Sequence, residues 1–118
     1  MIFDDFTTAS KYVDFPFKVK SSAIKILSAS TECNLRFMYE LLQIIDLPKG
    51  DHKRYYISEC QKKIVKIPTL KEQEAIVKII ICIDNLIELH EKELKFRKVQ
   101  KKSIMNQLLN GIFRVKCD

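Results

Sequence analysis

The chain has 118 residues, of which 47% are hydrophobic and 31% charged, with a formal net charge of +6 at pH 7. These values fit one folded soluble domain and argue against two independent cores, while 2 glycines and 3 prolines favour helices over a tight-turned all-β fold. The sequence has no apolar run of about 18 residues, and Met1–Asp5 lacks the pattern of a signal peptide, so we expect a soluble, intracellular protein.

The first twenty residues alternate short apolar runs with polar breaks. Phe15, Phe17 and Val19 recur at period two, which predicts a half-buried strand with Pro16 on an edge or at a bulge. We therefore expect one or two strands in this segment.

Two helices are predicted before residue 48. The serine pair at 21–22 can cap a short helix that runs to Leu27. A second helix is predicted from Asn34 to Ile45, because its apolar residues fall on one stripe. Pro48 ends this helix, since the residue before a proline avoids the helical conformation.

Two strand-like runs follow a turn at Gly50–Asp51. They are Tyr55–Ile57 and Ile64–Ile67. Together with the preceding elements, they predict a small lobe of mixed α and β structure over residues 1–66.

A long helix is predicted after this lobe. Thr69 and Glu72 have the spacing of a capping box, in which the Thr69 hydroxyl accepts the amide of Glu72 and the Glu72 carboxylate accepts the amide of Thr69. Gly111 supplies the stop, because glycine tolerates the left-handed conformation beyond a helix end. A continuous helix from Leu70 to Leu109 would be roughly 60 Å long at 1.5 Å per residue.

The predicted fold is therefore α+β. It consists of the small mixed α/β lobe at residues 1–66 and a region at residues 67–118 that contains one long C-terminal α-helix of coiled-coil type. A chain of this length is too small to bury such a helix completely, so we expect part of it to pair with another molecule.

An apolar stripe follows the predicted helix in alternating steps of three and four residues. Its members, which include three polar residues, are Ile76, Ile80, Ile83, Ile87, His90, Leu94, Arg97, Lys101, Ile104 and Leu108. The polar members weaken a self-sufficient dimer and favour an antiparallel partner helix with complementary groups. Three acid-before-base pairs should support the exposed middle of the helix, namely Glu88–Lys92, Glu91–Lys95 and Glu93–Arg97.

The net positive charge is compatible with DNA binding, although many lysine-rich proteins have a similar charge. The best local candidate follows the turn at Gly50–Asp51, where basic side chains stand beside tyrosines that could bond or stack with DNA. The full set of candidate DNA-binding residues is Lys18, Lys20, Lys49, His52, Lys53, Arg54 and Tyr55.

No catalytic motif, metal site or cofactor site is predicted. The sequence has no glycine-rich phosphate loop, nucleophile elbow, zinc-protease motif or amino-methyltransferase motif. Asp4–Asp5 is interpreted as a loop that orders the start of a strand, and His90 as a polar residue that sets helix register. The four widely spaced cysteines contain no C-x-x-C pair, so we expect free thiols in the cytoplasm.

Three segments resemble the specificity subunit of type I restriction-modification systems. Ile67–Ile76 is similar to the family's "I-P-P-L-x-E-Q" helix start, Ile83–Asp84 to its "l-D" step, and Gln107–Gly111 to its closing "l-L-t-G". The resemblance covers residues 64–114. Thr69 stands where the family usually has a second proline, but it supplies a capping hydroxyl that proline lacks.

A looser resemblance extends upstream. Phe3–Thr8, Asp14–Phe17 and His52–Ser58 look like the closing part of a target-recognition domain. The family's recognition domain is substantially longer than residues 1–66, so the resemblance implies that its opening half is not among these residues.

The resemblance implies a non-catalytic subunit that binds double-stranded DNA and docks type I methyltransferase subunits, with the restriction subunit as a further candidate partner. The long helix would pair in a homodimer or with another half-specificity subunit, away from any membrane. The alternative is a stand-alone coiled-coil adaptor that binds protein without specific DNA binding.

Overall fold

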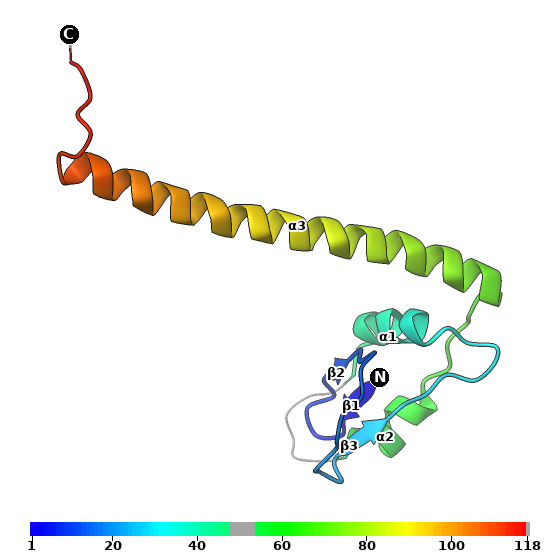
Figure 1. Cartoon of the computed structure of the whole chain (residues 1–118). Helices are drawn as coiled ribbons and strands as arrows, with labels where there is room; N and C mark the ends of the chain where they lie inside the picture. Colours follow the sequence, from blue (N-terminus) through cyan, green and yellow to red (C-terminus); the bar gives the residue numbers. More distant parts are fainter. Residues whose placement is uncertain (48–53, 118) are drawn as a thin grey trace. The chain divides into compact units, whose positions relative to one another are not determined.

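The computed structural model describes residues 1–47 and 54–117, and its secondary structure confirms the predicted α+β class (Figure 1). By its internal contacts the chain divides into two compact units, Met1–Lys78 and Ile79–Asp118. The division falls inside the long helix α3 (Leu70–Leu109), whose first two turns therefore belong to the first unit. The domain boundary predicted between residues 66 and 67 stays a prediction.

A three-stranded antiparallel sheet forms the centre of the first unit. Strand β1 (Ile2–Asp4) lies between β2 (Ser10–Lys11) and β3 (Ile24–Ile26). Phe3 of β1 is fully buried, and it pairs with Ser10 on one side and Lys25 on the other. The sheet thus places an aromatic side chain at the centre of a small core.

The turn between β1 and β2 is organised by Asp4. Its carboxylate accepts the backbone amides of Phe6 (2.9 Å) and Thr7 (3.3 Å), and the bond from the Phe6 amide is the main reason that the pKa of Asp4 is lowered. Thr8 takes a left-handed conformation with φ of 57°. Asp4 is thus the last residue of β1 rather than part of a loop, and its carboxylate orders the turn that leads into β2.

The predicted helix at residues 34–45 is confirmed as α1 (Leu35–Ile44). Asn34 is its N-cap, because the Asn34 side-chain oxygen accepts the amide of Phe37 at 3.0 Å. At the other end, the Gln43 side-chain amide donates to the Ser10 hydroxyl at 2.7 Å and joins α1 to β2.

The predicted strand around Phe15 and Phe17 is wrong. Residues 12–20 contain no strand, and the two phenylalanines are 57% and 42% exposed. The two strands of the first twenty residues are instead β1 and β2. The helix predicted up to Leu27 is also wrong, because the backbone of Ile24–Ile26 pairs with β1 as strand β3.

Both strands predicted after residue 54 are wrong as well. Tyr55–Ser58 forms the short helix α2, followed by one 3₁₀ turn, η1 (Cys60–Lys62). Ile64–Ile67 has no regular structure and leads into α3. The lobe is therefore mixed, as predicted, but with a different distribution of strands and helices.

Helix α3 confirms the predicted long helix, including both of its limits. It has 40 residues. The amides of Glu72 and Gln73 donate to the backbone carbonyl of Thr69 at 3.0 and 2.9 Å, and no side-chain hydrogen bond joins Thr69 to Glu72 in the described chain. The predicted capping box is therefore not formed, and backbone bonds close the first turn.

The far end of α3 stops at glycine, as predicted. Gly111 has a φ of 69° and its amide donates to the carbonyl of Leu108 at 3.2 Å.

Over residues 1–47 and 54–117, no helix combines the length and apolar character needed to cross a membrane.

Candidate helix-pairing and DNA-binding surfaces

The predicted apolar stripe of α3 is largely exposed. We call it the first stripe. Ile76 and Ile80 are half-buried, whereas the five apolar members beyond Ile80 are 42–55% exposed, and the polar members His90, Arg97 and Lys101 are exposed too. The described residues of this chain therefore leave most of the first stripe uncovered.

A second apolar stripe, which the sequence analysis missed, lies beside the first. It consists of Ile79, Cys82, Leu86, Leu89 and Phe96. Since each of its members directly precedes a member of the first stripe, the two stripes are separated by roughly 100° around the helix. The four members other than cysteine are 51–63% exposed. The same spacing rule, applied from Ile79 instead of Ile76, would have found it.

The two stripes together make an apolar surface wider than the seam of a two-helix coiled coil. One neighbouring helix can cover only part of such a surface. Helix α3 thus has room for contacts with more than one partner element.

Intrahelical ion pairs support the middle of α3. Lys92 pairs with Glu88, and Arg97 lies 3.5 Å from Glu93. A hydrogen bond from Lys92 lowers the pKa of Glu88. Two of the three predicted pairs are thus confirmed, whereas Glu91–Lys95 is not among the ion pairs of the described residues. These exposed pairs contribute little to stability, and their main effect is to keep a solvated helix ordered.

Gln73, at the base of α3, is a second feature that the sequence analysis missed. Its side chain is fully buried, one turn before the buried Val77. Two observations in the sequence could have indicated it. Gln73 closes the helix-start motif, and it lies three residues before Ile76 on the buried side of the helix.

The predicted DNA-binding residues that the structure describes have different environments. Lys18 and Lys20 are exposed in the irregular segment between β2 and β3, and Arg54 is exposed just before α2. The Arg54 guanidinium lies over the Phe6 ring, 5.8 Å from its centroid. Lys49, His52 and Lys53 lie outside the described residues.

Tyr55 differs from the other candidates because it belongs to the core. It is 5% exposed, so its ring is not available for stacking on a base. Its backbone amide donates to the carbonyl of Asp5 at 2.9 Å. The neighbouring Tyr56 amide donates to the Asp5 carboxylate at 2.8 Å. Asp5 therefore fixes the start of α2, and with it the position from which Arg54 extends.

The buried Asp5 also has a basic neighbour. The Lys25 ammonium of β3 lies 3.8 Å from the second carboxylate oxygen of Asp5, which is itself 2% exposed. A buried carboxylate needs such partners, because an unpaired buried charge is strongly unfavourable. Sheet and helix α2 are thereby joined through one side chain.

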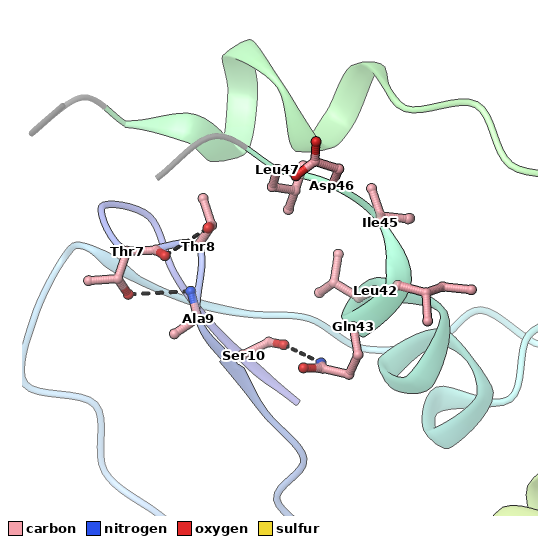
Figure 2. A pocket seen from close by; sticks show the side chains of 10 residues that line it. Thr7, Thr8, Ala9, Ser10, Leu42, Gln43, Ile45, Asp46 and Leu47 are labelled. Carbon is pink, nitrogen blue, oxygen red and sulfur yellow. Dashed lines mark hydrogen bonds between the residues drawn. The ribbon is translucent and has the colours of Figure 1, made fainter. Parts of the chain in front are cut away.

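A pocket of about 510 Å³ lies between the β1–β2 turn and the C-terminal end of α1 (Figure 2). The Ser10–Gln43 hydrogen bond crosses its wall, and Asp46 is the one acidic side chain among the described lining residues. The described lining of this pocket contains no histidine, cysteine or lysine side chain. Among the described residues, no three histidine, cysteine or acidic side chains form a cluster that could hold a metal ion.

The chain is similar to known restriction enzyme subunits. It is 38% identical, over 93% of its length, to the type I restriction enzyme EcoR124I/EcoR124II specificity subunit of Escherichia coli, of which it covers 30%. It is 46% identical over 52 residues to the type I restriction enzyme MjaVIII specificity subunit of Methanocaldococcus jannaschii. That match covers 44% of this chain and 12% of the archaeal protein.

No family model and no solved structure matches the chain. The chain spans less than a third of the length of these relatives. Their names agree with the family that the helix-start, Ile83–Asp84 and Gln107–Gly111 motifs indicate. The homologues of this chain are therefore type I restriction enzyme specificity subunits, and the chain corresponds to a segment of them.

Proposed function

We propose that the chain acts as a non-catalytic DNA-sequence specificity subunit, or as half or a segment of one, in a type I restriction-modification complex. In this role it binds DNA and scaffolds the methyltransferase subunits, which carry the chemistry. The observation that carries the proposal is the 40-residue helix α3 with its uncovered stripes, in a chain homologous to specificity subunits.

The scaffold role follows from the surface of α3. Burying apolar side chains against another helix is favourable by about 25 cal/mol for each Å² removed from water. In the proposed complex, the first stripe pairs with the helix of a second copy or of another half-specificity subunit. His90, Arg97 and Lys101 then select a partner with complementary groups. The methyltransferase subunit docks on the paired helices, so its binding depends on the first stripe, and the second stripe provides a further contact surface for it.

The DNA-binding role uses the exposed cations of the lobe. Lys18, Lys20 and Arg54, which are exposed, are proposed to contact phosphates, and Lys49, His52 and Lys53, which lie outside the described residues, are proposed as further contacts. Tyr55 supports the position of Arg54 from the core, because its buried ring and its bond to Asp5 hold the start of α2.

The scaffold role is tested by co-expression with a type I methyltransferase subunit. We expect the chain to co-purify with it, and we expect Ile87→Asp to weaken the association at least about tenfold because it places a charge in the first stripe. Ile81→Asp is the matched control, since Ile81 is also exposed but lies roughly 120° around the helix from Ile87.

Two results would contradict the scaffold role. One is failure of the wild-type chain to co-purify with the methyltransferase subunit. The other is equal loss of association in the Ile87→Asp and Ile81→Asp variants, because that result would show no dependence on the first stripe.

The DNA-binding role is tested by titrating duplex binding with salt. Replacing Lys18, Lys20 and Arg54 with alanine should reduce the slope of log affinity against log salt by about 0.9 for each DNA phosphate that the variant no longer neutralises. The matched control replaces three exposed lysines of α3, Lys95, Lys98 and Lys102, with alanine. Equal effects of the two triple variants would favour the stand-alone adaptor, which binds DNA only through its overall charge.

A further inference from the structure

The side chain of Gln73 makes three hydrogen bonds inside the first unit. Its nitrogen donates to the carbonyl of Pro68 at 2.9 Å and to the carbonyl of Glu32 at 3.2 Å. Its oxygen accepts the backbone amide of Asn34 at 2.8 Å. Because Gln73 is fully buried, these bonds replace those that water would otherwise make. Both donor positions and the acceptor of the amide are used.

The three bonds connect segments that are far apart in the sequence. Asn34 and Glu32 precede Gln73 by 39 and 41 residues, and both belong to the segment that leads into α1. Asn34 is also the N-cap of α1, since its side chain accepts the amide of Phe37. Gln73 therefore joins the first turn of α3 to the residue at which α1 begins.

The geometry requires glutamine at this position. A glutamate has the same length but, when ionised, can only accept hydrogen bonds, so its carboxylate would face the carbonyl oxygens of Pro68 and Glu32. Methionine fills a similar volume but can replace none of the three bonds. Asparagine has one methylene fewer and would hold its amide farther from these groups.

We propose that Gln73 is a positioning residue for DNA recognition: its side-chain amide fastens the start of α1 to the start of α3, and so holds the DNA-binding lobe to the base of the scaffold helix. This inference rests on the proposed function for its biological consequence. The fastening itself is a property of the chain alone and can be measured without DNA or partner subunits.

The fastening is tested by amide hydrogen exchange, resolved residue by residue by NMR. In Gln73→Met, we expect the exchange of the Asn34 amide to accelerate about tenfold or more, because this amide loses its acceptor. The Tyr56 amide, which is bonded to Asp5, should keep its exchange rate. Gln100→Met is the matched control, since Gln100 lies on the exposed part of the same helix.

Two exchange results would contradict the proposed connection between the starts of α1 and α3. One is an unchanged exchange rate of the Asn34 amide in Gln73→Met. The other is equal acceleration of the Asn34 and Tyr56 amides, because that pattern would mean general loss of stability rather than release of one connection.

Gln73→Glu provides a second variant with a pH-dependent readout. Burial beside two carbonyl oxygens should raise the pKa of the new carboxyl group above its unfolded value. Its stability relative to wild type should therefore be lowest at neutral pH and recover as the pH falls through the raised pKa. Glu32, Glu72 and Glu74 are present in both proteins, so the comparison at each pH removes their own titration. A difference that does not change with pH would overturn the assigned bonds.

The biological consequence is tested in the complex with a methyltransferase subunit. We expect Gln73→Met to co-purify with that subunit, because the stripes are unchanged, but to lose the wild-type methylation pattern. Full retention of the pattern, despite faster exchange at Asn34, would overturn the role in recognition. Failure of the wild-type chain to bind the methyltransferase subunit would instead contradict the proposed function. The exchange rate of the Asn34 amide would still show whether Gln73 connects the starts of α1 and α3.

Discussion

Two adjacent carboxylates, Asp4 and Asp5, hold the lobe by accepting backbone amides. Asp4 accepts from the turn that follows it, a local bond that the sequence allows one to expect. Asp5 accepts from Tyr56, which lies 51 residues later. No local pattern reveals such a distant cap. Tyr55–Ile57 therefore has the appearance of a strand in the sequence, although the structure makes it helical.

The role of Asp4 leads to a pH-dependent prediction. Its pKa is lowered mainly by the bond from the Phe6 amide, so its ionised form stabilises the folded state. This contribution is present above the unfolded pKa and is lost as the pH falls through the lower folded pKa. We expect Asp4→Asn to reduce the free energy of unfolding by about 1 kcal/mol or less at pH 7. The difference should shrink as the pH is lowered towards 3.

Urea unfolding of the wild-type and Asp4→Asn proteins at a series of pH values measures this effect. Asp14→Asn is a suitable control, because Asp14 is an exposed residue of the irregular segment after β2. A difference for Asp4→Asn that stays constant between pH 7 and pH 3 would be inconsistent with stabilisation by its charged form.

Helices α1 and α3 could be predicted from the sequence because their signals are local. The apolar spacing and the flanking residues Asn34 and Gly111 indicate where each helix lies. Strands depend on pairing between distant segments, as in the pairing of Ile24–Ile26 with β1. Alternation alone is insufficient: Phe15 and Phe17 have strand spacing, but their segment pairs with no strand within the described residues.

The end of α3 gives a prediction at this scale. Gly111 has a φ of 69°, and a Cβ atom placed there would meet nothing within 4 Å. The cost of Gly111→Ala is therefore that of the left-handed backbone alone, about 1–2 kcal/mol. We expect the last turn of α3 to fray in this variant. Faster exchange of the Asn110 amide would report the fraying.

Gly111→Asn is the matched variant, because asparagine tolerates the left-handed conformation better than alanine does. It should cause a smaller increase in the exchange rate of the Asn110 amide, which donates to Asn106 at 3.1 Å. An equal increase in the two variants would show that backbone conformation at this residue does not determine the helix end.

For the whole molecule, the motifs in the sequence indicate a resemblance to type I specificity subunits, and the relatives found by comparison carry that name. The first stripe was predicted residue by residue from its period, and its exposure is visible only in the structure. The width of the apolar surface and the role of Gln73 were missed. Gln73 could not be interpreted without the fold, because two of its partners lie 39 and 41 residues away.

The proposed function is tested most directly by the DNA methylation pattern in cells that express a type I methyltransferase subunit with or without this chain. We expect methylated sites sharing a defined sequence to arise only when the chain is present, and we expect Ile87→Asp, but not Ile81→Asp, to abolish them. A methylation pattern that is the same with and without the chain, when both proteins are present in folded form, would contradict the proposed function.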